Sequence, residues 1–341
     1  MPSKMLIRIG DMKKILRYCG LVALSGAALY LPSCDDDGGR EAYTGPWKKV
    51  KTPSDIGVSV GEIQFLSKTD GWAIAGKNLL KLKGKEWVIH KKILHPDPLA
   101  DYGFGGFHML SEREGWFVGP EWLPDPRGGG RTISHSTIWR FDGDKFTAVK
   151  HPDKEWLGTV WFNNADDGWA FGYGALHYSN GEWKEVELKD IVIDCFFFGE
   201  DDGWAVSGVP GGSIWRWDGV TWSRVFNCGL FEYFGCIAFD KPGSGWAGIF
   251  GPWTGGPHMY RYDGKRWDYS REKFEEDVIA IDFYGPNYGC AVGGEALIFE
   301  DGVWVPTADP KAVFWSVECV GPNDIWAGSD AGEIYHFTGF N

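Results

Sequence analysis

The sequence predicts an all-β protein built by repeating one unit of four short strands. A motif with tryptophan in a short apolar run recurs at intervals of 44, 53, 35, 42, 44 and 36 residues, which average about 42. Asp-Gly and Asn-Gly pairs separate alternating apolar and polar runs, and such pairs are the strongest short-range signal of a β-hairpin. Glycine supplies 49 and tryptophan 20 of the 341 residues, as expected for many tight turns between aromatic layers.

Each motif places one residue at the same point of the expected second strand, and we call this residue the anchor. The motifs are DGWAIAG (70–76), EGWFVGP (114–120), DGWAFGY (167–173), DGWAVSG (202–208), SGWAGIF (244–250), YGCAVGG (288–294) and DIWAGSD (324–330). The anchors are Trp72, Trp116, Trp169, Trp204, Trp246, Cys290 and Trp326. A period near 42 residues is typical of a four-stranded propeller blade. Seven anchors therefore predict a seven-bladed β-propeller of four-stranded antiparallel blades.

The other three strands of each unit follow from their patterns. The first is an apolar alternating run, as in 63–66 or 192–196. The third alternates again and ends at a glycine-containing turn, as in IWRFDG (138–143) or IWRWDG (214–219). The fourth opens with an aromatic residue: Trp87, Phe146, Trp183, Trp222, Trp267 or Trp304. We expect the anchors and these aromatic residues to form the packing layers between blades.

The seventh unit lacks a fourth strand of its own, because it reaches only HFTGFN (336–341). TGPWKKV (44–50) carries Trp47 at nearly the same distance from a glycine-containing turn as Trp222 in the fourth unit. We therefore expect the N-terminal strand to join the last blade and close the ring. Closure would leave no unpaired inner edge.

The turns between third and fourth strands carry a family resemblance. DGVTW (218–222), DGKRW (263–267) and DGVW (301–304) stand where BNR/Asp-box and HCF136-like (photosystem-assembly-factor type) propellers carry their Asp box. Over residues 44–341 the chain resembles these propellers and, among them, the repeats of bacterial envelope lipoproteins. The full Ser-x-Asp-x-Gly-x-Thr-Trp form is absent from the blades. The resemblance implies a propeller fold, whereas the box stabilises a turn and implies no chemistry.

Residues 1–33 are typical of a lipoprotein signal peptide. Lys13, Lys14 and Arg17 precede an apolar run of 13 residues over 19–31, and LPSC (31–34) resembles a lipobox. Such a run is shorter than the roughly 20 residues that span a bilayer. We expect Cys34 to be acylated, residues 34–43 to form an acidic, glycine-containing tether, and 44–341 to form the propeller. The predicted location is the bacterial cell envelope, at the outer membrane or cell surface. An ordinary secretory signal with an incidental cysteine is the alternative.

The charge excludes one class of partner. The chain carries a formal net charge of −13, and without residues 1–33 it has 29 basic and 46 acidic side chains. Nucleic-acid binding needs basic stripes, so we expect no nucleic-acid partner. The eight histidines have no zinc-like spacing, and no glycine-rich phosphate loop precedes a helix. We therefore expect no metal and no cofactor.

The cysteines after Cys34 are consistent with two alternatives. These are a Cys228–Cys236 disulfide, or buried free thiols at Cys195, Cys228, Cys236, Cys290 and Cys319.

The predicted binding surface lies where the loops vary in length. Turns between first and second and between third and fourth strands are short and emerge on one face, which we call the turn face. Turns between second and third strands and the links between blades emerge on the other, the loop face, with its longest insertion at 119–136. The candidate ligand-binding residues on it are Trp122, Trp253, Trp156, Tyr102, Phe104, Phe231, Tyr233, Arg127, Arg131, His135 and His258. Alternatively, these loops pack on one another and plug the channel.

We expect a monomeric, non-catalytic binding or assembly module for an envelope or extracellular protein or a glycan, held at the membrane by acyl chains on Cys34. Exposed aromatic residues with a few polar groups suit such ligands. The alternative is a carbohydrate-active hydrolase or lyase, sialidase- or BNR-like, on the same scaffold. It would need two carboxyl groups about 5–10 Å apart, and Asp97, Asp101, Glu155 and Glu232 lie on the loop face. No arginine trio from separate blades accompanies them. Photosystem-type assembly is a third possibility, disfavoured by the acidic charge.

Overall fold

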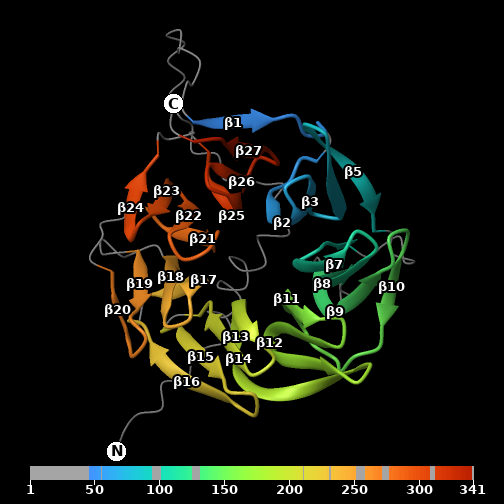
Figure 1. Ribbon diagram of the computed structural model, residues 1–341. Coiled ribbons are helices and arrows are strands. Elements are labelled where there is room, and N and C mark those ends of the chain that lie inside the picture. The colour runs from blue at the N-terminus through green and yellow to red at the C-terminus, as the bar shows by residue number, and fades with distance from the viewer. Residues whose placement is uncertain are drawn as a thin grey trace, which may run out of the picture.

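A computed structural model describes residues 46–54, 56–93, 101–124, 131–209, 211–229, 232–250, 258–270, 276–307 and 312–339. The described chain forms antiparallel strands arranged around a common axis (Figure 1). The prediction of an all-β propeller is confirmed. The predicted signal peptide, the tether and Cys34 lie outside the described residues.

Four of the sheets have four strands each. From the axis outwards, they contain β2 (Val60–Ser67), β3 (Asp70–Ala75), β4 (Asn78–Lys83) and β5 (Glu86–Lys92); β17 (Tyr233–Lys241), β18 (Ser244–Phe250), β19 (Met259–Tyr262) and β20 (Trp267–Tyr269); β21 (Val278–Phe283), β22 (Tyr288–Gly293), β23 (Ala296–Glu300) and β24 (Val303–Pro306); and β25 (Phe314–Gly321), β26 (Asp324–Ser329), β27 (Ile334–Phe337) and β1 (Trp47–Val50).

The remaining two sheets are larger. The five-stranded sheet contains β7 (Gly106–Ser111), β8 (Glu114–Pro124), β9 (Arg131–Phe141), β10 (Phe146–Val149) and the short β6 (Asp101–Tyr102). The six-stranded sheet contains β11 (Leu157–Asn164), β12 (Asp167–Ser179), β13 (Glu182–Gly199), β14 (Asp202–Ser207), β15 (Ser213–Trp217) and β16 (Trp222–Asn227). The prediction of a seven-bladed β-propeller of four-stranded antiparallel blades is therefore wrong: the described strands form six sheets, and the third and fourth units share one.

Two long strands explain the shared sheet. β13 runs for 18 residues, pairing with β12 through its first part and with β14 from Val192 onwards. Residues 187–191, which link the two units, contain neither glycine nor proline, so nothing in their sequence breaks the extended backbone. β12 turns back on itself near Gly174, which has a φ of +84°. The reversal is required because Asp167 and His177, ten residues apart, are joined by a contact of 2.6 Å.

The N-terminal strand β1 pairs with β27, as the sequence predicted. Trp47 lies opposite Phe337 and Val50 opposite Ile334 in antiparallel register. Figure 1 shows these two segments, from opposite ends of the chain, side by side. A further backbone bond runs from the amide of Trp87, in β5, to the carbonyl of Lys51 just after β1.

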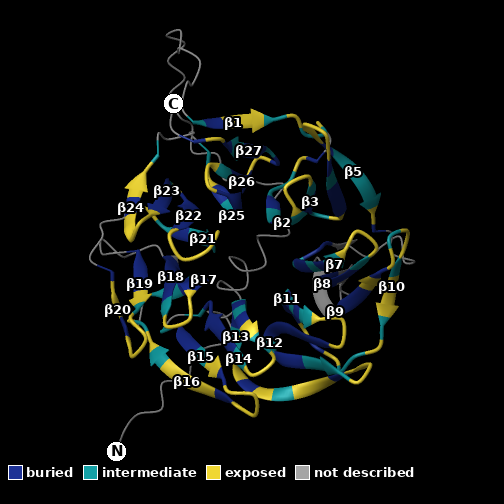
Figure 2. Ribbon diagram, in the orientation of Figure 1, coloured by how far each residue is buried: buried dark blue, intermediate teal, exposed yellow. Residues whose placement is uncertain are grey.

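The core consists of hydrophobic clusters between successive units, and we call each such contact a joint. In a typical joint the anchor of one unit meets, edge to face, the aromatic residue that opens the fourth strand of the next unit. These ring pairs, with centroids 5.5–5.9 Å apart, are Trp326–Trp87, Trp116–Trp183, Trp169–Trp222, Trp204–Trp267 and Trp246–Trp304. Figure 2 shows that the strands around these joints are buried, whereas the outermost strands expose many residues.

The third strands place a basic or imidazole side chain on the anchor ring. Lys81 lies 4.3 Å from the ring centroid of Trp72, and Arg261 lies 5.2 Å from that of Trp246. The rings of His177 and His336 stack on Trp169 and Trp326 at 4.2 and 4.0 Å. Where the anchor is Cys290, the residue opposite it in β23 is Ile298. A cation is stabilised when it lies over the face of an indole ring. A unit whose anchor is not tryptophan offers no such ring, so a cation at this position would gain no stabilisation.

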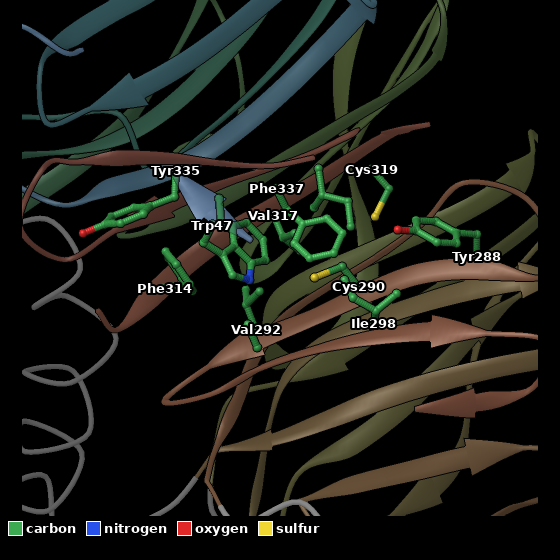
Figure 3. Packing of buried hydrophobic residues seen from close by; sticks show 13 residues of the cluster. Trp47, Tyr288, Cys290, Val292, Ile298, Phe314, Val317, Cys319, Tyr335 and Phe337 are labelled. Atoms are coloured by element: carbon green, nitrogen blue, oxygen red, sulfur yellow. The ribbon is translucent and has the colours of Figure 1, made fainter. Parts of the chain in front are cut away.

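The cysteine alternatives are resolved for the part of the chain that the structure describes. Cys195, Cys228, Cys236, Cys290 and Cys319 are all free. Cys290 is completely buried in a cluster with Trp47, Phe314 and Phe337 (Figure 3).

Candidate functional site

Four carboxyl groups lie on the innermost strands, where each faces the next unit. Glu62 accepts a hydrogen bond from the amide of Phe107 at 2.8 Å, and Asp194 accepts one from Ile237 at 2.8 Å. Asp282 accepts one from Cys319 at 2.6 Å. Glu318 accepts one from Phe65 at 3.2 Å. We call Glu62, Asp194, Asp282 and Glu318 the axial carboxyls. They link neighbouring inner strands that share no strand pairing.

Burial raises the pKa of each of the four axial carboxyls. It raises the pKa of Glu62 to about 8, that of Asp194 to about 7 and that of Asp282 to about 6, and it raises the pKa of Glu318 well above its usual value. The backbone hydrogen bonds act in the opposite direction but are outweighed. Burial also lowers the pKa of the nearby His108 to about 4, so this imidazole is neutral near pH 7.

The axial carboxyls were not predicted, although a signal for them was present in the sequence. Each stands inside a largely apolar first strand, as in VIAIDF (278–283) or SVECV (316–320). An acid in a strand that must be buried needs a partner. That partner is the backbone of the next unit, so it is supplied only when the units pack against one another.

The long insertion at 119–136 adds a three-stranded extension to the second unit. β8 and β9 continue their pairing out to Pro124 opposite Arg131, and β6 pairs with the far side of β8. Within it, Tyr102 lies opposite Glu121, and Trp122 lies opposite both Asp101 and Ile133. At its base the buried Glu121 contacts His135 at 3.0 Å and accepts a hydrogen bond from Thr137 at 2.5 Å.

The structure thus brings four of the predicted ligand-binding residues into one extension: Tyr102, Trp122, Arg131 and His135. The His135 side chain is half-exposed, at 44%.

Three of the predicted residues are buried instead. Phe104 packs on Phe117 and Trp139 in a joint, because its backbone is held there by hydrogen bonds from its own amide to Gly76 and from the next amide to Val118. Trp156 is covered where its link passes Tyr173. His258 lies 3.2 Å from Asp277 and is also buried. These side chains serve the packing of the loop face rather than an exposed surface.

The remaining predicted residues divide into two groups. Tyr233 is partly buried at the start of β17. Cys34, Arg127, Phe231 and Trp253 lie outside the described residues.

A second polar cluster on the loop face forms around Glu232. Its carboxylate accepts hydrogen bonds from the amide of Gly229 at 3.0 Å, from the Tyr260 hydroxyl at 2.9 Å and from the Tyr269 hydroxyl. The rings of Tyr260 and Tyr269 stack at 4.3 Å, and burial raises the pKa of both hydroxyls. Three donors to one carboxylate fix the link in place. Glu232 is one of the acids considered for catalysis, and its carboxylate is instead occupied by hydrogen bonds that hold this link.

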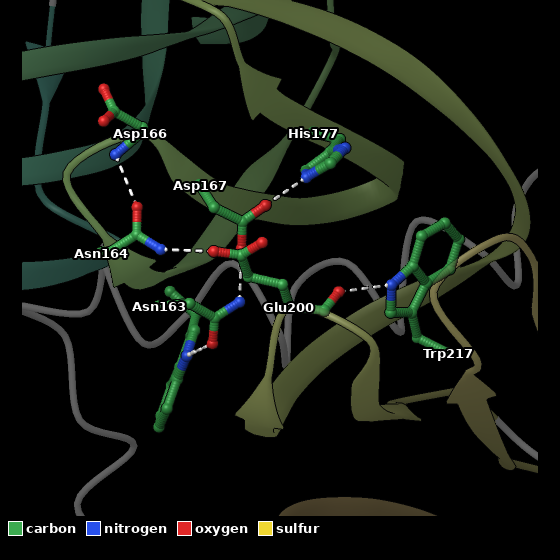
Figure 4. Close-up of polar contacts among 8 residues, drawn as sticks. Asn163, Asn164, Asp166, Asp167, His177, Glu200 and Trp217 are labelled. Atoms are coloured by element: carbon green, nitrogen blue, oxygen red, sulfur yellow. Dashed lines mark hydrogen bonds and ion pairs between the residues drawn. The ribbon is translucent and has the colours of Figure 1, made fainter.

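The turn face carries polar contacts of the same kind. Asp167 lies between the His177 ring, at 2.6 Å, and the side-chain amide of Asn163, which donates to it at 2.5 Å (Figure 4). Nearby, Asn164 donates to Glu200 at 2.8 Å across to the next unit. These bonds hold the turns rather than present free groups.

Two features are absent from the described residues. No group of three or more His, Cys, Asp or Glu side chains there is arranged to hold a metal ion. Within the same residues, no helix has the length and apolar character needed to cross a membrane.

Comparisons with solved structures support the fold. YCF48 bound to D1 peptide superposes with a TM-score of 0.65 at 15% identity, covering 88% of this chain and 99% of that one. The WD40 β-propeller domain of Doa1 gives a TM-score of 0.61 at 12% identity, covering 86% and 96%. The extracellular domain of the one-component system BT4673 from B. thetaiotaomicron gives 0.64 at 9% identity, covering 85% of this chain and 40% of that one.

These likenesses show the β-propeller fold alone, since all three identities are low. No protein-family model matches the chain, and no curated protein sequence is significantly similar to it. The Asp-box resemblance stays a prediction.

Proposed function

We propose that this protein is a non-catalytic binding module that engages a partner through the extension formed by β6, β8 and β9. The observation that carries the proposal is the register of this extension, which places Tyr102, Trp122, Arg131 and His135 on three adjacent strands. Large aromatic side chains with a few cationic or imidazole groups are typical of the centres of protein interfaces.

A protein segment is the preferred partner, with a glycan as the other candidate. One solved structure with the same fold, YCF48, is bound to a peptide. At 15% identity this supports a shared scaffold, and the proposal of a peptide ligand for this chain rests on that analogy together with the extension.

The envelope location belongs to the same proposal. The basic segment, apolar run and LPSC (31–34) favour acylation of Cys34. Two or more acyl chains hold a protein stably on a membrane, whereas one chain binds reversibly. Metabolic labelling with a fatty acid tests this: the native chain should be labelled and Cys34→Ala should not. Labelling of Cys34→Ala would overturn the anchor.

The binding proposal is tested with residues 44–341, which contain every described strand. Pull-downs from envelope extracts and a glycan array should be run with the native domain, Trp122→Ala and Tyr284→Ala. Tyr284 is an exposed aromatic residue on the opposite, turn face and is the matched control. We expect Trp122→Ala to weaken binding by roughly 30-fold, the effect of losing a hot-spot residue, while Tyr284→Ala binds normally. Equal binding by all three would overturn the proposed surface.

A carbohydrate-active enzyme on the same scaffold remains the second candidate. Asp101 stands in β6, and Glu155 is exposed on the link before β11. Among the carboxyl groups, the most strongly raised pKa values belong to the axial carboxyls. These four already bind backbone amides. Glycan turnover that vanishes in Asp101→Asn or Glu155→Gln would favour the enzyme.

A further inference from the structure

The axial carboxyls form the only contacts of their kind within the described chain: acids on one inner strand bound to amides of the next. Glu62 reaches from β2 to β7, Asp194 from β13 to β17, Asp282 from β21 to β25, and Glu318 from β25 to β2. These bonds are spread around the axis, so four of the places where successive units meet depend on an ionisable group.

A neutral side chain can make the same contact. Gln64, two residues after Glu62 on β2, accepts a hydrogen bond from the amide of Met109 at 2.7 Å and donates one to its carbonyl at 3.1 Å. The hydrogen bond therefore does not require a negative charge, and a protonated carboxyl can hold the neighbouring strand much as this amide does.

Among the residues that the structure describes, no cationic side chain is paired with an axial carboxyl. The charges that act on the axial carboxyls come from one another: Asp194 acts on Glu62, while Asp282 and Glu62 act on Glu318. No lysine or arginine among the described residues contributes to any of the four.

The other titratable groups near the axial carboxyls carry no positive charge near neutral pH. His108 on β7 is neutral there. The thiols of Cys195 on β13, Cys236 on β17, Cys290 on β22 and Cys319 on β25 stay protonated, because burial raises the pKa of each. Ionisation of several axial carboxyls therefore places like charges together in a poorly solvated space.

We propose that the axial carboxyls make the contacts between successive units respond to pH, so that the units are held together most tightly in mildly acidic solution. Protonation keeps the hydrogen bonds and removes the repulsion. Ionisation keeps the hydrogen bonds but adds repulsion and the cost of burying charge.

The sign follows from linkage. A carboxyl whose pKa is higher in the folded than in the unfolded protein binds its proton more tightly in the folded protein. Its stabilising effect is complete below its unfolded pKa and is lost as the pH rises through its folded pKa. For Glu62, Asp194 and Asp282 the window therefore extends from about 4 up to about 8, 7 and 6.

The test is urea unfolding of the purified full chain at several pH values between about 5 and about 8. We expect the unfolding midpoint to fall as the pH rises. In Glu62→Gln the fall should shrink by roughly a quarter or more, since one of four groups no longer ionises. The midpoint of this variant at the alkaline end should equal or exceed that of the native protein. Asp194→Asn should act in the same direction and serves if Glu62→Gln does not fold.

Glu155→Gln is the matched control, because Glu155 is an exposed carboxylate in a protein of net charge −13. It separates an axial effect from general charge repulsion, and we expect it to leave the pH dependence unchanged. A native midpoint that is flat or rises with pH would overturn the proposal. So would an effect of Glu155→Gln as large as that of Glu62→Gln.

Discussion

Two joints of the same molecule solve one packing problem in different ways. Between the fifth and sixth units, the anchor Trp246 meets Trp304 edge to face at 5.5 Å and 87°. Between the sixth and seventh units the anchor is Cys290, and the joint is filled by Trp47 from the far end of the chain, packed on Phe314 and Phe337 at 5.3 Å each. Figure 3 shows the Trp47 ring among these side chains.

The difference shows that what is common to these joints is a fully packed core between units, whereas the residue at the anchor position can vary. Where the indole of the anchor is missing, the cation that would cover it is replaced by Ile298. The Trp47 indole N–H also donates a hydrogen bond to the Thr307 hydroxyl at 3.0 Å. One joint relies on two indoles and the other on one indole with smaller neighbours.

The largest expected effect comes from emptying the first of these joints. Trp246→Ala removes a completely buried indole from between two units, and we expect a loss of about 3–5 kcal/mol in the free energy of unfolding. Cys290→Ala, at the equivalent position of the other joint, removes only a sulfur atom and should cost about 1 kcal/mol. Urea unfolding of both variants measures the difference. Similar losses of unfolding free energy in the two variants would contradict the proposal that the anchor contributes much more packing to the first joint than to the second.

A nearly equal effect is expected at Trp47, although it belongs to a four-residue strand near the N-terminal end of the fold. Trp47→Ala should cost about 3–5 kcal/mol, because the neighbouring Cys290 is too small to fill the space. Trp47→Phe keeps most of the ring but loses the bond to Thr307, and should cost about 1–2 kcal/mol. Thermal unfolding with Thr307→Val as a control separates the bond from the packing. A loss below about 1 kcal/mol for Trp47→Ala would mean that β1 adds little to the last sheet.

The smallest effect tests the paired loss of indole and cation. Arg261→Met removes the charge over Trp246 but keeps a similar stem, and we expect a loss of about 0.5–1 kcal/mol. Ile298→Arg places a cation opposite Cys290, where no indole ring lies beneath it, so we expect no increase in the free energy of unfolding. Chemical denaturation of both variants provides the measurement, and stabilisation by Ile298→Arg would contradict this explanation.

Much of the fold could be predicted from local patterns. Each anchor motif became a second strand, and the aromatic residues opening the fourth strands lie in the joints, because hairpin turns and alternation act over a few residues. The pairing of Trp47 with β27 was predictable from one missing strand and one spare strand. The number of sheets was not, because whether the chain bends between units depends on the five residues at 187–191 and on the pairing of Tyr173 with Ile191.

The candidate site was less predictable than the fold. The sequence predicted a long loop over 119–136, whereas β8 and β9 continue their pairing out to Pro124 and Arg131 within it. Burial of Phe104, Trp156 and His258 depends on where the links fold, which no local pattern records. By itself the sequence determined the strand order, the turns and the aromatic layers, since these follow from side-chain size and backbone preference. Only the tertiary structure decided which acids meet which amides across the axis, because each such pair joins residues about 40 or more than 250 positions apart.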